Sequence, residues 1–372
     1  MTAKFVNLSF VRKKNTDMIL SAFSFKTSGW DLTEMGAIQT TNLLVGKNAS
    51  GKTRTIRALQ NVTNFLQVRP IVFGESDFKV KLTFTDPKDV GWRMVYQFEI
   101  AQGKVASEQL SVNGKSLIKR SEEKTLFMGE TINPPKEKLV VQVRRDRDDY
   151  PEVEKLMEWA EGVVFVSCSN INPLTVFISG SSVVNPLPFS TLVETLTKEG
   201  KKAVITEARG LGYEVMDLTT VKANGEMKFV VVNERYVKSN VMDFQLSSGM
   251  MRVLYILCFL EFVKHSDKYS LLLIDDLGEG LDYYRATLLG KKVFEACGSS
   301  HIQMIASSND SFMMDVVDIS KWHILRRKNS KLTVLNQNNQ PELFSRFRMT
   351  GLSNFDLFSS DYIDNYLARN SK

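Results

Sequence analysis

The segment 46–53, GKNASGKT, constrains the fold of this chain more than any other feature. It has the spacing of a phosphate-binding loop, in which backbone N–H groups and the start of a helix surround a phosphate. The short apolar run 42–45 leads into it and predicts a buried strand. After it, apolar residues recur at positions 56, 59, 62, 65 and 66, which predicts an amphipathic helix ending near Gln67. Strand, glycine-rich loop and helix therefore follow one another as phosphate binding requires.

This loop predicts ATP and Mg²⁺ as cofactors. The Lys52 ammonium would reach the β and γ phosphates, and the Thr53 hydroxyl would ligate Mg²⁺. The residues expected to surround the phosphates are Gly46, Lys47, Asn48, Ala49, Ser50, Gly51, Lys52 and Thr53.

Three further motifs follow in the last third of the chain. The first, LSSGMMR at 246–252, is by itself only a serine-capped helix start. It precedes an apolar strand with two acids at its end, LLLIDD at 271–276, and then GEGLD at 278–282. Taken with the phosphate loop, this order of motifs resembles the ABC ATPases of the SMC, RecF and OLD group, to which phage-defence ATPases are related.

The resemblance implies an α/β fold: an ABC-ATPase head with a mixed central sheet, an antiparallel β subdomain and a helical lobe that carries the signature motif. Ser247, Ser248 and Gly249 would face the γ-phosphate held by a second copy, which implies a homodimer closed around ATP. Asp275 would hold Mg²⁺ through its water shell, together with Thr53.

Two positions depart from the pattern of the family. Asp276 stands where the family usually has a glutamate as the base for the attacking water, and Glu279 is a nearby alternative acid. Asn309 stands where most relatives have a histidine that contacts the γ-phosphate, and an amide cannot carry the charge of an imidazolium. Asp282 matches a residue that touches the opposite subunit. The resemblance, with these departures, implies an ATPase with slow hydrolysis.

Pattern and composition divide the chain into four segments. Residues 1–150 are expected to form the first part of the ATPase lobe, with the phosphate loop and the β subdomain. Residues 151–245 form a middle helical and β insertion, and residues 246–340 form the signature helix and the second half of the lobe. Residues 341–372 form an aromatic C-terminal segment.

Alternating apolar residues predict antiparallel strands at the N-terminus, near positions 5, 8 and 10, then over 18–25 and 30–35. More strands are expected over 78–129, with an Asn-Gly hairpin turn at 113–114.

In the middle insertion, helices are predicted over 152–160 and 191–198, with the apolar strand VVFVS between them. Residues 201–239 are predicted to be mostly strands. Because no heptad pattern persists, we do not expect a long coiled-coil arm.

Two interpretations of the C-terminal segment stay open. Its aromatic residues either fold back as core or form a docking surface for a partner protein. They are Phe344, Phe347, Phe355, Phe358 and Tyr362.

Composition favours a soluble cytoplasmic protein. Three distant cysteines fit a reducing compartment, and the longest apolar stretch, 250–263, is too short and too interrupted to cross a bilayer. The three histidines occupy no catalytic spacing. The net charge of +6 gives modest support to contact with polyanions.

Two functions are compatible with these features. The first is a nucleotide-gated dimeric ATPase that controls a separately encoded effector protein in anti-phage defence. The alternative is a DNA repair or recombination ATPase of the RecF kind, which would clamp duplex DNA. A transporter ATPase is disfavoured by the two-serine signature and the β-rich middle.

Overall fold

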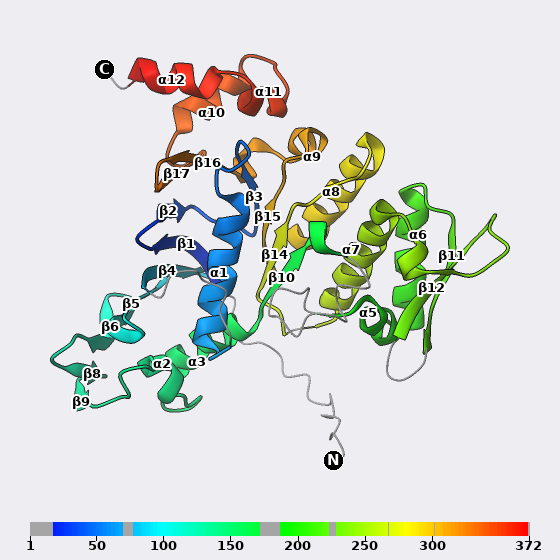
Figure 1. The fold of residues 1–372 in the computed structure, drawn as a ribbon. Coiled ribbons are helices and arrows are strands. Elements are labelled where there is room, and N and C mark those ends of the chain that lie inside the picture. Colours follow the sequence, from blue (N-terminus) through cyan, green and yellow to red (C-terminus); the bar gives the residue numbers. More distant parts are fainter. Residues whose placement is uncertain are drawn as a thin grey trace.

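The computed structural model describes residues 18–69, 77–171, 187–222, 228–266, 268–300 and 302–370. The strand predicted near positions 5 to 10 lies outside them. Within these ranges, one sheet of fourteen strands runs through the molecule, and a sheet of three strands belongs to the helical lobe. Figure 1 shows α1 in front of the large sheet, the helical lobe on the right and the C-terminal helices at the top.

One half of the large sheet is parallel, with the order β10, β14, β15, β3, β16. These strands are Val163–Ser167, Leu271–Asp275, Gln303–Ser307, Thr41–Val45 and Trp322–Lys328. Their register aligns Ser167 with Asp275 and Ser307 with Leu44. The carboxyl ends of β14, β15 and β3 therefore meet at one edge, where the phosphate loop begins.

The other half is mostly antiparallel and forms the predicted β subdomain. Its strands are β17 (Lys331–Leu335), β2 (Asp31–Gly36), β1 (Ile19–Lys26), β4 (Phe78–Asp86), β5 (Asp89–Ala101), β6 (Lys104–Val112), β7 (Lys115–Arg120), β8 (Thr125–Phe127) and β9 (Glu130–Ile132). Only β17 and β2 pair in parallel here. Asn113 and Gly114 both have positive φ, 51° and 80°, which confirms the predicted hairpin turn.

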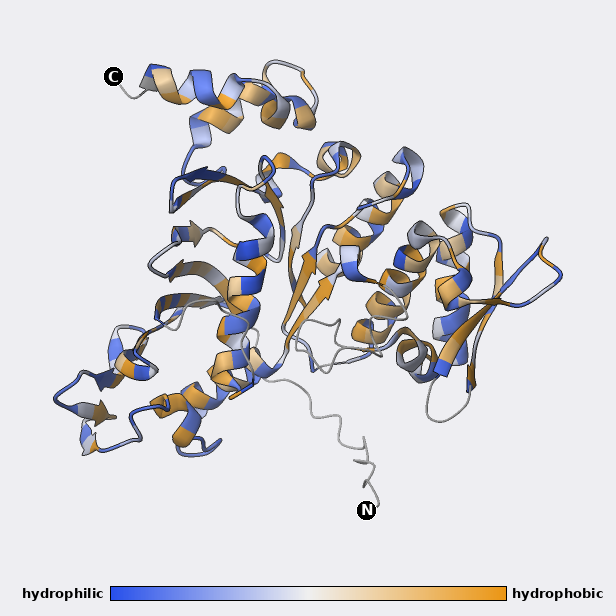
Figure 2. Ribbon diagram, in the orientation of Figure 1, coloured by the Kyte–Doolittle hydropathy of each residue, from blue (hydrophilic) through white to orange (hydrophobic). Residues whose placement is uncertain are grey.

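Helices cover both faces of the parallel half. On one side lie α1 (Lys52–Leu66), α2 (Val140–Val143) and α3 (Pro151–Glu161), and on the other α7 (Ser248–Lys264), α8 (Tyr283–Gly298) and α9 (Ser311–Val316). In β14, Leu271 and Leu273 face the α1 core, whereas Leu272 and Ile274 face the α7 core. A strand buried on both faces needs an unbroken apolar run, visible as orange in Figure 2.

The helical lobe corrects one prediction. It contains α5 (Phe189–Thr195), α6 (Lys198–Gly210) and the strands β11 (Val215–Lys222), β12 (Lys228–Glu234) and β13 (Val241–Met242). The prediction of strands from 201 was wrong over 201–210, because Thr197 caps a helix there by accepting from the Gly200 N–H at 3.0 Å. Val204 and Ala208 are the buried face of α6, too narrow a stripe to stand out among its charged residues.

The C-terminal segment folds as core, as one of its two interpretations predicted. It forms α10 (Pro341–Arg348), α11 (Asn354–Ser359) and α12 (Tyr362–Asn370). Phe344 and Phe347 are fully buried, and Phe355, Phe358 and Tyr362 pack against the same core. The large sheet also includes β10, which belongs to the segment predicted as a middle insertion. The boundaries of the four segments predicted from the sequence stay predictions. In the described part of the chain, no helix is long and apolar enough to span a membrane.

Candidate nucleotide site

The phosphate loop closes around its own lysine. The Lys52 Nζ donates to the carbonyl oxygens of Gly46 (2.6 Å) and Lys47 (3.4 Å). Ala49 and Gly51 adopt positive φ of 62° and 103°, which turns the loop into the start of α1. Burial lowers the pKa of Lys52, and the nearby Asp276 and Asp275 charges oppose that shift. A phosphate would replace the two carbonyls as the partner of the ammonium.

The predicted metal ligands come together beside this loop. Thr53 Oγ1 donates to Asp275 Oδ1 at 3.1 Å, and Ser307 Oγ donates to the same oxygen at 2.6 Å. Burial raises the pKa of Asp275, and the Ser307 bond opposes that shift. Hydroxyl and carboxylate oxygens suit Mg²⁺. Among the described residues no cluster of three His, Cys, Asp or Glu could hold a metal, so nucleotide oxygens and water would have to complete its shell.

Asp276, the predicted base, has a constrained backbone. Its φ is 58°, in the left-handed region, and its N–H donates to Ser307 Oγ at 3.0 Å. Aspartate enters this region more easily than longer side chains do, because its short carboxyl can bond locally. This is a physical reason for Asp rather than Glu here. Glu279 follows on the exposed surface, with its N–H bonded to the Asp276 oxygen at 3.1 Å.

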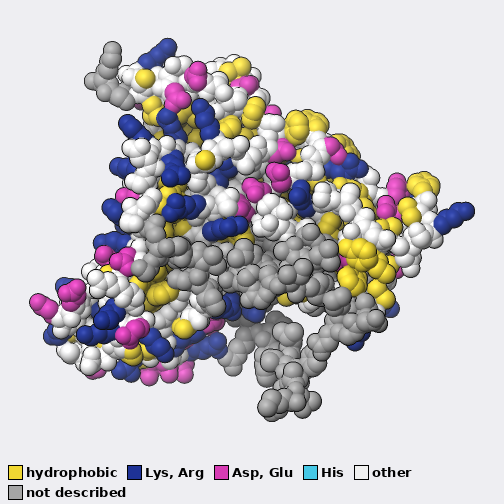
Figure 3. All heavy atoms as spheres, in the orientation of Figure 1, with side chains coloured by type: hydrophobic (Ala, Val, Ile, Leu, Met, Phe, Trp, Pro, Cys, Tyr) yellow, Lys and Arg dark blue, Asp and Glu magenta, His cyan; other side chains and the backbone are white. Residues whose placement is uncertain are grey.

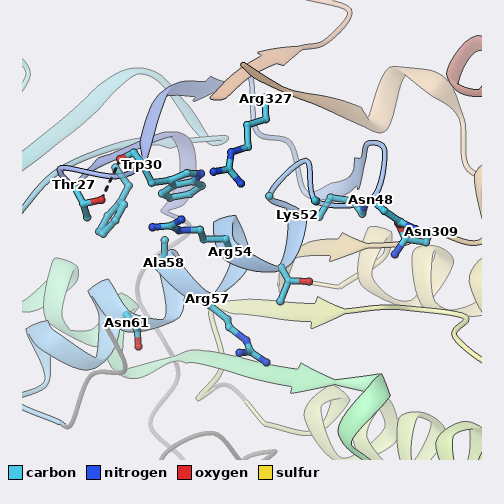
Figure 4. A pocket seen from close by; sticks show the side chains of 14 residues that line it. Thr27, Trp30, Asn48, Lys52, Arg54, Arg57, Ala58, Asn61, Asn309 and Arg327 are labelled. Carbon is cyan, nitrogen blue, oxygen red and sulfur yellow. Dashed lines mark hydrogen bonds between the residues drawn. The ribbon is translucent and has the colours of Figure 1, made fainter. Parts of the chain in front are cut away.

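A cavity of about 560 Å³, called the nucleotide cavity below, runs from the phosphate loop along α1. Its lining includes Asn309, so the structure brings the position of the relatives' γ-phosphate histidine to the phosphate loop. The loop residues that line it are Asn48, Ala49, Gly51, Lys52 and Thr53. Figure 4 shows Asn309 next to Asn48 at one end of the cavity and Trp30 at the other. Asp275, Asp276 and Glu279 are not part of its wall.

The far end of the cavity holds residues that sequence reasoning missed. The Arg54 guanidinium lies 5.1 Å from the centre of the fully buried Trp30 ring, and Arg327 reaches in from β16 (Figure 4). Arg57 lines the same space from α1. A planar guanidinium stacked on an indole can extend the stack to a base. The only sequence signal for this end of the cavity was Arg54, directly after the phosphate loop. Trp30 lies in the turn between β1 and β2, before the loop, and no pattern in the sequence connects the two.

The signature residues do not line the nucleotide cavity of the same chain. Ser247 caps α7 by accepting from the Met250 N–H at 3.3 Å, as expected for a serine-capped helix. Ser247 and Ser248 are exposed, and neither they nor Gly249 line the cavity. One copy therefore presents a phosphate loop and an exposed signature at separate places.

The signature helix α7 is hydrogen-bonded to the segment 278–282. Arg252 Nη1 donates to the Glu279 carbonyl at 2.6 Å, and a Cβ on Gly280 would come within 2.2 Å of that nitrogen. Asp282 caps α8 by accepting from the Arg285 N–H at 3.0 Å and pairs with the Arg285 side chain. This network makes the signature and the Asp282 loop one structural unit.

Comparisons with known proteins agree with this architecture. No family model matches the sequence, and no curated protein matches it significantly. Among solved structures, it is similar to an SMC head bound to the C-winged helix domain of ScpA (13% identity, 85% of this chain and 97% of the other, TM-score 0.53). It is also similar to an SMC head with an extended coiled coil bound to the C-terminal domain of ScpA, derived from Pyrococcus furiosus (11%, 89% and 100%, TM-score 0.53). The chain has the fold of an SMC head, the ABC-ATPase head fold that its motifs predicted.

Proposed function

We propose that this protein is a slow ATPase in which two copies close head to tail around ATP and act as a nucleotide-gated switch. The observation that carries the proposal is the separation of two half-sites on one chain. The phosphate loop, Thr53 and Asp275 form one half beside the cavity, and the exposed Ser247 and Ser248 form the other. A second copy, related by a two-fold axis, would complete both sites.

Different side chains of this protein would bind the phosphates, hold Mg²⁺ and accept the proton of the attacking water. Lys52 would leave its two carbonyl partners for the β and γ phosphates, and Thr53 and Asp275 would hold the Mg²⁺ shell. Mg²⁺ would neutralise charge developing on the phosphates. Asp276 would accept a proton from water, with Glu279 as the alternative. Asn309 would hydrogen-bond the γ-phosphate without supplying positive charge, which favours slow turnover.

We infer a separate effector protein, in anti-phage defence, as the output of the switch. The support is the helical lobe: in residues 187–222 and 228–247, the longest helix is the thirteen-residue α6, and a three-stranded sheet fills the rest. A lobe without a long arm suits direct contact with a partner protein. Clamping of DNA is the alternative that the net charge of +6 supports.

ATP turnover by purified protein tests the site. Lys52→Ala should abolish ATP binding or turnover, whereas Lys328→Ala, at the exposed end of β16, should leave both unchanged. An unaffected rate in Lys52→Ala would refute the site assignment.

Size-exclusion chromatography with and without a non-hydrolysable ATP analogue tests closure. Ser248→Arg should keep nucleotide binding and lose the nucleotide-dependent dimer, and Ser239→Arg, exposed in the same lobe, is the matched control. A dimer that forms equally in Ser248→Arg would contradict the head-to-tail arrangement.

Purification from the native host tests the output. Co-purification of a neighbouring gene product would support the effector, and ATP-strengthened, salt-sensitive binding of duplex DNA would support the clamp instead.

A further inference from the structure

A second cavity, of about 410 Å³, lies on the other side of the phosphate loop. Residues 46–50 form one wall, the end of β16 forms another, and Phe358 and Ile363 of the C-terminal helices close it. It shares Asn48, Ala49 and Arg327 with the nucleotide cavity but none of the residues at positions 30, 52, 53 or 54. Its volume is in the range of small-molecule sites.

The charged groups around this cavity favour an anion. Two cations that do not line the nucleotide cavity, Lys47 and Arg326, line this one together with a single carboxylate, Asp364, which pairs with Arg326. Arg327 lines both cavities, but its Nε–H donates to the Asn329 carbonyl oxygen at 2.8 Å and its guanidinium points into the nucleotide cavity (Figure 4). Figure 3 shows Lys and Arg side chains gathered at the upper left of this face, below the C-terminal helices.

The remaining wall combines apolar surface with an unpaired hydroxyl. Phe358, Ile363 and Ile324 belong to one core cluster and supply the apolar part of this wall, whereas the Leu325 side chain packs in the opposite core. Ser50 is only 6% exposed, and its Oγ has no hydrogen-bond partner among the described residues. A buried hydroxyl without a partner is unfavourable.

We propose that this second cavity binds a small aromatic anion of the size of a nucleoside monophosphate. Its negative group pairs with Lys47 and Arg326, and its ring packs on Phe358. Because Asn48 and Ala49 line both cavities, occupancy here couples the C-terminal helices to the phosphate loop. The site goes beyond the proposed ATP switch and does not need ATP turnover.

Calorimetric titration of the full chain with adenosine, guanosine, cytidine and uridine 5′-monophosphate tests this site. The nucleotide cavity is first filled with Mg²⁺ and the ATP analogue AMP-PNP. At least one monophosphate should bind with one-to-one stoichiometry. Arg326→Gln should weaken that binding roughly tenfold, since it removes a charge-assisted bond. Asp364→Asn should strengthen it, because it removes the competing carboxylate. Lys328→Gln, the exposed neighbour that lines neither cavity, is the control.

Two further variants keep the test decisive. Phe358→Leu should also weaken binding, and it serves if Arg326→Gln fails to fold, which thermal unfolding would reveal. Lys52→Ala should retain monophosphate binding, and the Lys52→Ala, Arg326→Gln double variant should weaken it, so the second cavity can be tested even if the proposed ATP site fails. Absence of binding by all four monophosphates would overturn the proposal. So would binding that Lys52→Ala removes and Arg326→Gln leaves intact, because the ligand would then occupy the nucleotide cavity.

Discussion

Replacing Glu108 by Gln would test how the β subdomain is held against the helix that follows the phosphate loop. Glu108 is fully buried on β6, and its carboxylate accepts the N–H groups of Val140 (2.6 Å) and Val141 (3.3 Å) and the Tyr96 hydroxyl (3.0 Å). Gln142, in the same short helix, donates to the Phe65 oxygen near the end of α1 at 2.7 Å. One carboxyl group therefore connects the subdomain to α1.

Burial raises the pKa of Glu108 from its ordinary 4.5 to about 7, against the opposing effect of its hydrogen bonds. The folded protein then holds the proton more tightly than the unfolded chain. This contribution to stability is fully present below pH 4.5 and is lost as pH rises through 7. At about 1.4 kcal/mol per pH unit, the full loss is roughly 3.4 kcal/mol, of which about 2.5 kcal/mol falls between pH 5 and 8.

His323 acts in the opposite direction over nearly the same range. Burial lowers its pKa from 6.5 to about 4, and its Nε2 lies 3.0 Å from Asn42 Oδ1. Its contribution is present above pH 6.5 and is lost as pH falls towards 4. The two buried groups should nearly cancel in the wild-type chain, and Glu108→Gln should expose the histidine contribution alone.

Urea unfolding of wild type and Glu108→Gln at pH 5, 6, 7 and 8 measures the effect. The difference in their free energies of unfolding should move by about 2.5 kcal/mol across this range, with wild type losing stability relative to the variant as pH rises. Glu99→Gln, a half-exposed carboxylate on β5 paired with Lys79, should show no such trend. Parallel pH profiles for wild type and Glu108→Gln would refute the reasoning.

Three other substitutions have defined outcomes. Val68→Gly should raise the free energy of unfolding by about 1 kcal/mol, because the exposed Val68 holds a φ of 57° after α1; no rise in Tm would contradict this. Ser307→Ala should cost about 1.5–3 kcal/mol of stability and weaken Mg²⁺-dependent binding of a fluorescent ATP analogue, because it removes the bond to Asp275; equal Mg²⁺ dependence in both proteins would count against it. Arg54→Ala should weaken ATP and ADP binding alike, since Arg54 lies at the Trp30 end of the cavity; selective loss of ATP would place it at the γ-phosphate instead.

The arrangement of the candidate nucleotide site was predictable because its parts are local or lie at strand ends. The phosphate loop follows directly from residues 46–53, and α1 ends at Leu66, where the apolar spacing predicted. Asp275 and Ser307 meet because parallel strands bring their carboxyl ends to one edge. The roles assigned to the site residues stay predictions. Those that rest on the family resemblance are the roles of Ser247, Ser248, Gly249, Asp275, Asp276, Glu279, Asp282 and Asn309.

The far end of the nucleotide cavity could not be predicted, because its residues come from three distant segments. Trp30, Arg54 and Arg327 meet only after β17 pairs with β2 and places the end of β16 beside the β1–β2 turn. Helix α6 was missed for a different reason: its cap and its packing against α7 stabilise it, and its own apolar stripe is short.

By itself, then, the sequence determined a loop with phosphate-binding spacing, a serine-capped signature helix and an α/β head, since each depends on short-range patterns. The tertiary structure decided what surrounds the loop. It buried the aromatic C-terminus as core, left Ser247 and Ser248 exposed and opened two cavities that both reach Asn48 and Ala49. These outcomes depend on how distant elements pack, and side chains separated by hundreds of residues leave no local pattern to read.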